Sequence, residues 1–169
     1  MTQPTRSPEA PSGFTWPVRV YYEDTDAGGI VFYANYLKFM ERARTEWLRS
    51  LGIEQQKLRE TSGGIFVVSE TSLKYHRPAR LDDQLLVTAQ LRQAGTASLI
   101  IEQRVLSNPE QKSAPEELPA QALLCEGTIR IGWVNAASMR PSRLPASVSN
   151  VFERIAFSRG TPPGAASQQ

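Results

Sequence analysis

Residues 21–47 read YYEDTDAGGIVFYANYLKFMERARTEW, and we expect this stretch to organise the fold. From Asn35 onward its apolar residues are spaced three and four apart, which is the pattern of a helix with one buried face. Gly52 stands where a helix that ends in a left-handed residue places its glycine. The spacing therefore predicts a helix of about four to five turns. Its apolar positions are Tyr36, Phe39, Met40, Ala43, Trp47, Leu48 and Leu51.

Strand-like segments flank this helix on both sides. Residues 16–22 alternate, with Val18, Val20 and Tyr22 on one face, which is the period of a half-buried strand. Beyond the helix, β-branched and apolar runs are separated by turn residues, as in a sheet of sequential strands. The expected strands are 16–22, 65–75, 84–92, 98–106 and 122–134, and the expected short helices are 54–60 and 145–157.

One strand, one apolar helix and four more strands predict an α+β fold, in which a five-stranded antiparallel sheet packs on one long central helix. The length of 169 residues suits a single domain, which we place at 16–145 with a loop insertion at 107–120. The Pro- and Ser-rich residues 1–15 are expected to form a disordered tail, and residues 146–169 a short helix and a tail. Because such a sheet has free edges, two copies are expected to pair through them.

Composition excludes several classes of function. Nineteen Lys and Arg against seventeen Asp and Glu leave a formal charge of only +2, so nucleic-acid binding is not expected. The single cysteine, Cys125, cannot form an internal disulfide and fits a reducing compartment. No apolar run has the length of a signal peptide or a membrane span. We therefore expect a cytoplasmic protein.

The chemistry is expected in the turn before the helix. Asp26 is followed by Ala27, Gly28 and Gly29, whose small size lets a ligand approach the backbone. The first N–H groups of a helix lack partners within the helix and carry the positive end of its dipole. A carboxylate beside such donors suits attack on a carbonyl, because the donors can bind the oxyanion. Asp and Gly are also the ordinary residues of a strand-to-helix connection, in which Asp24 would cap its own turn.

Other reactive residues are weaker candidates. The pair Asp24 and Asp26 has no third ligand nearby, so no metal site is expected. His76 is the only histidine and has no cysteine or second histidine beside it, which favours a structural or surface role. Cys125 lies between Leu124 and Glu126 without a histidine partner, so we expect a buried thiol and no nucleophile.

The segment Val18–Leu48 resembles the acyl-CoA thioesterases of the Tol–Pal-associated type, in the 4-hydroxybenzoyl-CoA thioesterase family of hotdog proteins. The similarity covers about Pro17–Pro145. The stretches that carry it are YYEDTDAGGIV, ANYLKF and ERARTEWL, followed by Phe66-Val67-Val68, Pro78-Ala79-Arg80-Leu81-Asp82-Asp83 and Gly95-Thr96.

The resemblance implies a hotdog fold that dimerises with each active site at the subunit interface, and many relatives pair such dimers into tetramers. It implies Asp26 as nucleophile or general base, and the backbone N–H at Tyr33 as oxyanion donor. It implies no cofactor, since coenzyme A is part of the substrate. The neighbouring residues that we assign to substrate binding are Gly28, Gly29, Ile30 and Phe32.

The chain departs from the family pattern at Tyr33, where close relatives often have histidine and the hydroxybenzoyl branch has tyrosine. A tyrosine there can line the acyl pocket or form a hydrogen bond near the thioester. Hotdog hydratases place a histidine five residues after their catalytic aspartate, and this chain has Val31 there, which disfavours dehydration. The basic residues that we consider for the coenzyme A phosphates are Lys74, Arg77, Arg80, Arg92 and Arg104.

The leading hypothesis is therefore an acyl-CoA thioesterase, with acyl carrier protein as a second candidate carrier of the acyl group. One alternative is a hotdog module that binds acyl thioesters or acyl carrier protein without cleaving them. Another is an adaptor at the cell envelope. The acyl group stays open among short aliphatic, fatty and aromatic classes.

Overall fold

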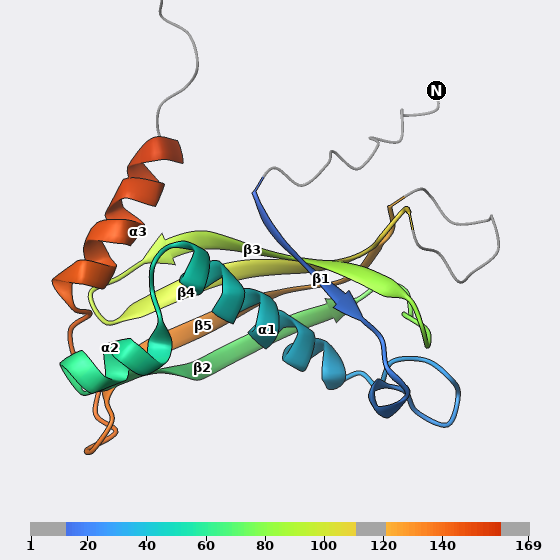
Figure 1. Cartoon of the computed structure of the whole chain (residues 1–169), viewed down its shortest axis with the longest axis horizontal. Coiled ribbons are helices and arrows are strands. Elements are labelled where there is room, and N and C mark those ends of the chain that lie inside the picture. The colour runs from blue at the N-terminus through green and yellow to red at the C-terminus, as the bar shows by residue number, and fades with distance from the viewer. Residues whose placement is uncertain (1–12, 111–120, 160–169) are drawn as a thin grey trace, which may run out of the picture.

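The computed structural model describes residues 13–110 and 121–159, which form a five-stranded antiparallel sheet with three α-helices (Figure 1). The strand order is β1-β3-β4-β5-β2, so β1 and β2 are the two edges. This confirms the predicted α+β fold with five antiparallel strands. The strands are β1 (Phe14–Arg19), β2 (Gly64–Tyr75), β3 (Gln84–Ala94), β4 (Ser98–Ser107) and β5 (Leu123–Asn135).

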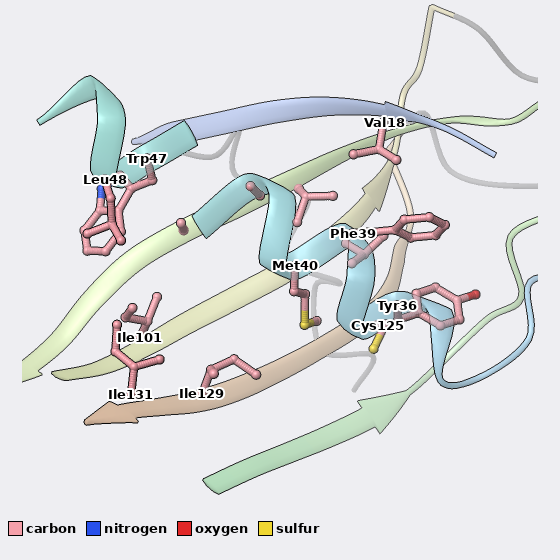
Figure 2. Close-up of a cluster of buried hydrophobic side chains, with 14 of the residues drawn as sticks. Val18, Tyr36, Phe39, Met40, Trp47, Leu48, Ile101, Cys125, Ile129 and Ile131 are labelled. Atoms are coloured by element: carbon pink, nitrogen blue, oxygen red, sulfur yellow. The ribbon is translucent and has the colours of Figure 1, made fainter. Parts of the chain in front are cut away.

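The long helix α1 (Asn35–Ser50) lies across one face of the sheet (Figure 1). Its predicted apolar face is the buried one, and Phe39, Met40 and Ala43 are fully enclosed. Figure 2 shows the Met40 side chain directed toward Ile129 of β5. Burying one side chain of the size of Phe39 contributes about 1.5–3 kcal/mol. Gly52 has a φ of 81°, so the left-handed helix end that the sequence predicted is present.

The C-terminal helix α3 (Ala146–Arg159) contributes to the core, although we had placed it outside the domain. Phe152 is completely buried, and its ring centroid lies 5.8 Å from that of Trp47. Val148 is buried with it. Residues beyond 145 therefore pack into the same hydrophobic cluster as α1.

The N-terminal edge also differs from the prediction. β1 begins at Phe14, so Phe14 and Thr15 belong to the sheet and not to a tail. Tyr22 is 83% exposed, because the chain leaves the strand and enters a short 3₁₀ turn, η1 (Tyr22–Asp24). The predictions for residues 1–12, 111–120 and 160–169 lie outside the described residues.

The second helix, α2 (Gln55–Ser62), follows the predicted segment closely and ends at Gly63, whose φ is 70°. Within the described ranges, no helix combines the length and the apolar character that crossing a membrane requires.

Candidate active site

The loop between η1 and α1 folds back on itself around Asp26. The backbone N–H of Asp26 donates to the carbonyl of Ile30 at 2.9 Å, and Gly29 N–H donates to the carbonyl of Asp26 at 3.0 Å. Gly29 has a φ of 73°, which favours glycine. The glycine run is thus needed for the tight turn that places Asp26 at its start.

The Asp26 side chain is exposed to solvent, and one of its two carboxylate oxygens accepts a hydrogen bond from the protein. Its Oδ1 atom accepts a hydrogen bond of 2.8 Å from the backbone N–H of Gly28. A Cβ at Gly28 would lie 3.1 Å from the same oxygen, tighter than most such contacts, so Gly28 leaves room for the carboxylate. Within the described part of the chain, Oδ2 accepts no hydrogen bond. One carboxylate oxygen is therefore oriented and the other is available to a ligand.

A backbone donor follows in the same loop. Phe32 N–H donates to the Asp24 carbonyl at 2.9 Å, and Asn35 N–H donates to the Phe32 carbonyl at 2.8 Å. The N–H of Tyr33, between these two, has no acceptor among the described residues. The cap position of α1, Ala34, has no capping side chain either. This end of the helix therefore offers unpaired donors and a positive dipole end to a bound anion.

Asp24 supports the loop through its carboxylate and its carbonyl. Its carboxylate is 3% exposed and accepts a 2.8 Å hydrogen bond from the Tyr21 N–H, as expected for a residue that caps its own turn. Its carbonyl accepts a second bond from Asn35 Nδ2 at 2.9 Å. No group of three His, Cys, Asp or Glu residues suited to a metal is found in residues 13–110 and 121–159.

Aromatic rings gather beside the loop. Phe32 and Tyr33 are 43% and 63% exposed, and their ring centroids are 4.6 Å apart. Tyr75, at the end of β2, lies 6.4 Å from Tyr33 and 5.6 Å from Tyr36, measured between ring centroids. Sequence analysis did not single out Tyr75, because it lies 42 positions after Tyr33 and no local pattern connects the two residues.

The bend after β2 holds the loop from its other side. Val31 N–H donates to the Ala79 carbonyl at 2.9 Å, and Ala79 N–H donates to the Tyr36 hydroxyl at 3.0 Å. Burial raises the pKa of Tyr36, which keeps its hydroxyl protonated. Ile30 and Arg80 form an isolated antiparallel bridge. The loop, the helix start and this bend therefore form one connected unit.

The five basic residues that we considered for binding phosphates fall into two sets in the structure. Arg92 and Arg104 belong to an ion-pair ladder on the sheet, in which both contact Glu102, at 3.4 and 3.2 Å. Arg104 also lies 4.0 Å from Glu126, which contacts His76 at 3.0 Å. The other set, at the end of β2 and in the bend beside the loop, is Lys74, Arg77 and Arg80.

Cys125 is fully buried in β5, as predicted for a thiol without a catalytic role. Burial, and to a smaller extent the nearby Glu126, raises its pKa to about 11. The thiol therefore stays protonated near neutral pH, and a thiolate nucleophile is not available there.

A cavity of about 150 Å³ lies between α1, α2 and β2, away from the Asp26 loop of the same chain. Arg44 borders it and is 9% exposed, with one hydrogen bond of 2.9 Å from Nη1 to Gln103 Oε1. Burial lowers the pKa of Arg44, and nearby Glu41 opposes that effect. The residues that line the cavity are Glu41, Arg44, Thr45, Leu48, Gln55, Phe66, Val67, Val68 and Ile131.

An antiparallel sheet around one long helix, with an aspartate loop at the start of that helix, defines a hotdog protein of the thioesterase type. The model of the thioesterase superfamily matches residues 28–114. The chain belongs to this superfamily.

Relatives match over nearly their whole length. An acyl-CoA thioesterase YbgC from Haemophilus influenzae is 39% identical over 144 residues, which are 85% of this chain and 97% of that protein. An acyl-CoA thioester hydrolase YbgC from Escherichia coli O6:H1 is 40% identical, over 83% of this chain and 96% of that protein. The crystal structure of a probable thioesterase from Bartonella henselae is 30% identical with a TM-score of 0.64, covering 78% of this chain and 98% of that one. Thioester hydrolysis is thus the chemistry of its class.

Proposed function

We propose that this chain hydrolyses acyl-CoA thioesters to a free carboxylic acid and coenzyme A. The observation that carries the proposal is the Asp26 carboxylate, oriented by Gly28 N–H in the loop that leads to the unpaired N–H of Tyr33. Membership of the superfamily and the names of the two YbgC relatives support the substrate class. The protein acts in the cytoplasm and needs no metal or redox cofactor.

Asp26 promotes attack on the thioester carbonyl in one of two ways. As a nucleophile, its oxygen bonds to the carbonyl carbon, the carbon–sulfur bond breaks, and water then hydrolyses the mixed anhydride. As a general base, it takes a proton from the water that attacks the carbonyl carbon, the carbon–sulfur bond breaks, and coenzyme A leaves and takes up that proton. In both, negative charge develops on the carbonyl oxygen and the Tyr33 N–H stabilises it, an interaction whose loss typically reduces the rate about 100- to 1,000-fold.

The substrate-binding surface proposed for this site is the rest of the loop. Gly28 and Gly29 allow close approach to the backbone, while the Ile30 and Phe32 side chains are partly exposed beside it. The cations proposed for the phosphates are those next to the loop, Lys74, Arg77 and Arg80, because Arg92 and Arg104 already pair with carboxylates.

We propose further that two copies pair through β2, the longer of the two edge strands, with 12 residues against 6 in β1. Val68 and Tyr75 on this strand are 54% and 46% exposed, which supports a covered edge. Antiparallel pairing places the Tyr75 end of one copy beside the Gly64–Val68 end of the other. The Asp26 loop of one copy then lies near the 150 Å³ cavity of the second. A tetramer would be a pair of such dimers.

The test is the Asp26→Asn variant in an assay of thiol release from acyl-CoA. We expect the turnover number to fall at least about 100-fold, because the amide can neither attack nor accept a proton effectively. Glu23→Gln is the matched control, since it removes an exposed carboxylate from the adjacent turn. Unchanged turnover in Asp26→Asn would contradict the mechanism.

A second candidate function is binding of acyl thioesters or acyl carrier protein without cleavage. It is favoured by Tyr33, which stands where close relatives often carry histidine. Tight binding of acyl-CoA without release of free thiol would identify it. A panel of aliphatic and aromatic acyl-CoA and acyl carrier protein substrates separates the two functions and defines the acyl group, with the exposed Tyr33 ring favouring aromatic acyl groups.

A further inference from the structure

Tyr75 connects the end of β2 to the loop before α1 through its hydroxyl group. Its Oη atom donates a 2.9 Å hydrogen bond to the carbonyl oxygen of Tyr33. We propose that Tyr75 is a positioning residue, which acts on the reaction by holding the backbone of Tyr33 in the orientation that binds the oxyanion. This inference rests on the proposed function of the Tyr33 N–H.

The two peptide groups that flank the Cα atom of Tyr33 are each held by one hydrogen bond. The first contains the Phe32 carbonyl, which accepts from Asn35 N–H at 2.8 Å. Because a trans peptide directs its C=O and N–H to opposite sides, this bond turns the Tyr33 N–H away from the helix. The second contains the Tyr33 carbonyl, which Tyr75 holds. Together they restrain both backbone rotations at Tyr33, and so the direction of its N–H.

The Tyr33 carbonyl has a competing partner. In a regular α-helix it would accept from the N–H of Leu37, four residues later. Leu37 N–H instead donates to the Ala34 carbonyl at 3.2 Å, so the helix begins one residue later. Without the Tyr75 hydroxyl, the Tyr33 carbonyl is free to take the Leu37 N–H. That change would rotate the peptide between Tyr33 and Ala34. The Tyr33 N–H belongs to the preceding peptide, so the change would reach it through the Cα atom that the two peptides share.

The fold does not depend on this hydroxyl. In the single chain Tyr75 is 46% exposed, and α1 is anchored independently by buried side chains such as Tyr36 and Phe39. Removing the oxygen while keeping the ring preserves the edge contacts with Tyr33 and Tyr36. The effect should therefore appear in the transition state, where the oxyanion forms, and not in ground-state binding or stability.

The experiment compares Tyr75→Phe with wild type in thiol release from acyl-CoA. We expect kcat to fall about three- to ten-fold, the range for loss of one neutral hydrogen bond, with KM changed less than about two-fold. The thermal midpoint should move by less than about two degrees. Tyr22→Phe is the matched control, because Tyr22 is 83% exposed at the same end of the molecule.

Unchanged kcat in Tyr75→Phe would overturn the inference, as would a loss that appears only in KM or that follows a lowered thermal midpoint. Asp26→Asn, measured in parallel, separates this failure from that of the proposed function. If Asp26→Asn is inactive and Tyr75→Phe is normal, only the role of Tyr75 fails. If Asp26→Asn retains full activity, the proposed mechanism fails, and the positioning role fails with it.

Discussion

Cys125 has no proposed role in catalysis, but the raised pKa of its thiol makes the stability of the protein depend on pH. Its thiol lies beneath the first turn of α1, close to Tyr36, as Figure 2 shows. With the native pKa at about 11, above the ordinary value of 9.0, the unfolded chain loses this proton first as the pH rises. The contribution of the thiol to stability is therefore complete below about pH 9 and is lost between about pH 9 and pH 11.

We expect the free energy of unfolding of wild type, relative to Cys125→Ala, to decrease across that pH window. Both proteins are unfolded with denaturant at several pH values from 8 to about 10.5. Because the two proteins have the same tyrosines and lysines, the titrations of those residues cancel in the difference between the two free energies. In the folded protein at pH 8, a thiol reagent should label Cys125 only after unfolding. Rapid labelling of the native protein would show that the thiol is accessible and not buried as described.

At the same scale, the loop illustrates what local sequence can reveal. Asp26 and its glycines were identified because their residue types predict a tight turn with an exposed carboxylate. Sequence analysis also raised Asp24 as a residue that could cap its own turn, and the structure shows its carboxylate accepting a hydrogen bond from the Tyr21 N–H. The catalytic roles of Asp26 and Tyr33 stay predictions until Asp26→Asn is measured.

Among the elements, the β2–β5 pair depends on one glycine. Gly127 in β5 pairs with Leu73 in β2, and a Cβ at position 127 would lie 2.6 Å from the backbone oxygen of Ser72. Backbone cannot move aside as a flexible side chain can. We expect Gly127→Ala to destabilise the protein by about 1–3 kcal/mol through this overpacking.

Gly132→Ala is the control, because it lies in the same strand and its Cβ would meet nothing closer than 3.9 Å. Denaturant unfolding of the two variants should separate them clearly. Equal stability of both would show that β2 and β5 are farther apart in solution than the structure places them.

The helices differ in how far sequence analysis described them. For α1 the spacing of apolar residues sufficed, because a buried helix face has a period that local sequence displays. For α3 the sequence predicted the helical segment but not its packing in the core. That packing depends on a contact between Phe152 and Trp47, which are far apart in the sequence. The irregularity in β2 between Val68 and Glu70 left no sequence signal that we used.

At the scale of the whole molecule, the proposed dimer through β2 can be tested directly. We expect wild type to be a dimer or a tetramer by light scattering, and Val68→Lys to shift it toward monomer with at least about ten-fold lower activity, because a charge would be placed in the covered edge. Met139→Lys is the matched control, since Met139 is 57% exposed against 54% for Val68 and lies outside β2.

A wild-type monomer with full activity would contradict the proposed interface. If instead Val68→Lys remains assembled and active, another surface must join the copies. In either case the Asp26 loop would have to bind its substrate without the cavity of a second copy.

The sequence by itself determined the α+β class of fold and the long helix, and it predicted a tight turn at Asp26, because helix periodicity and turn preference are local properties. Only the tertiary structure decided that Tyr75 contacts Tyr33, that Asp24 supports the loop, and that Arg92 and Arg104 are already paired with carboxylates. Most of these contacts join residues on separate strands or on a strand and a loop, and even the local one at Asp24 depends on how the chain turns. Such contacts form only when the sheet brings distant segments together around α1.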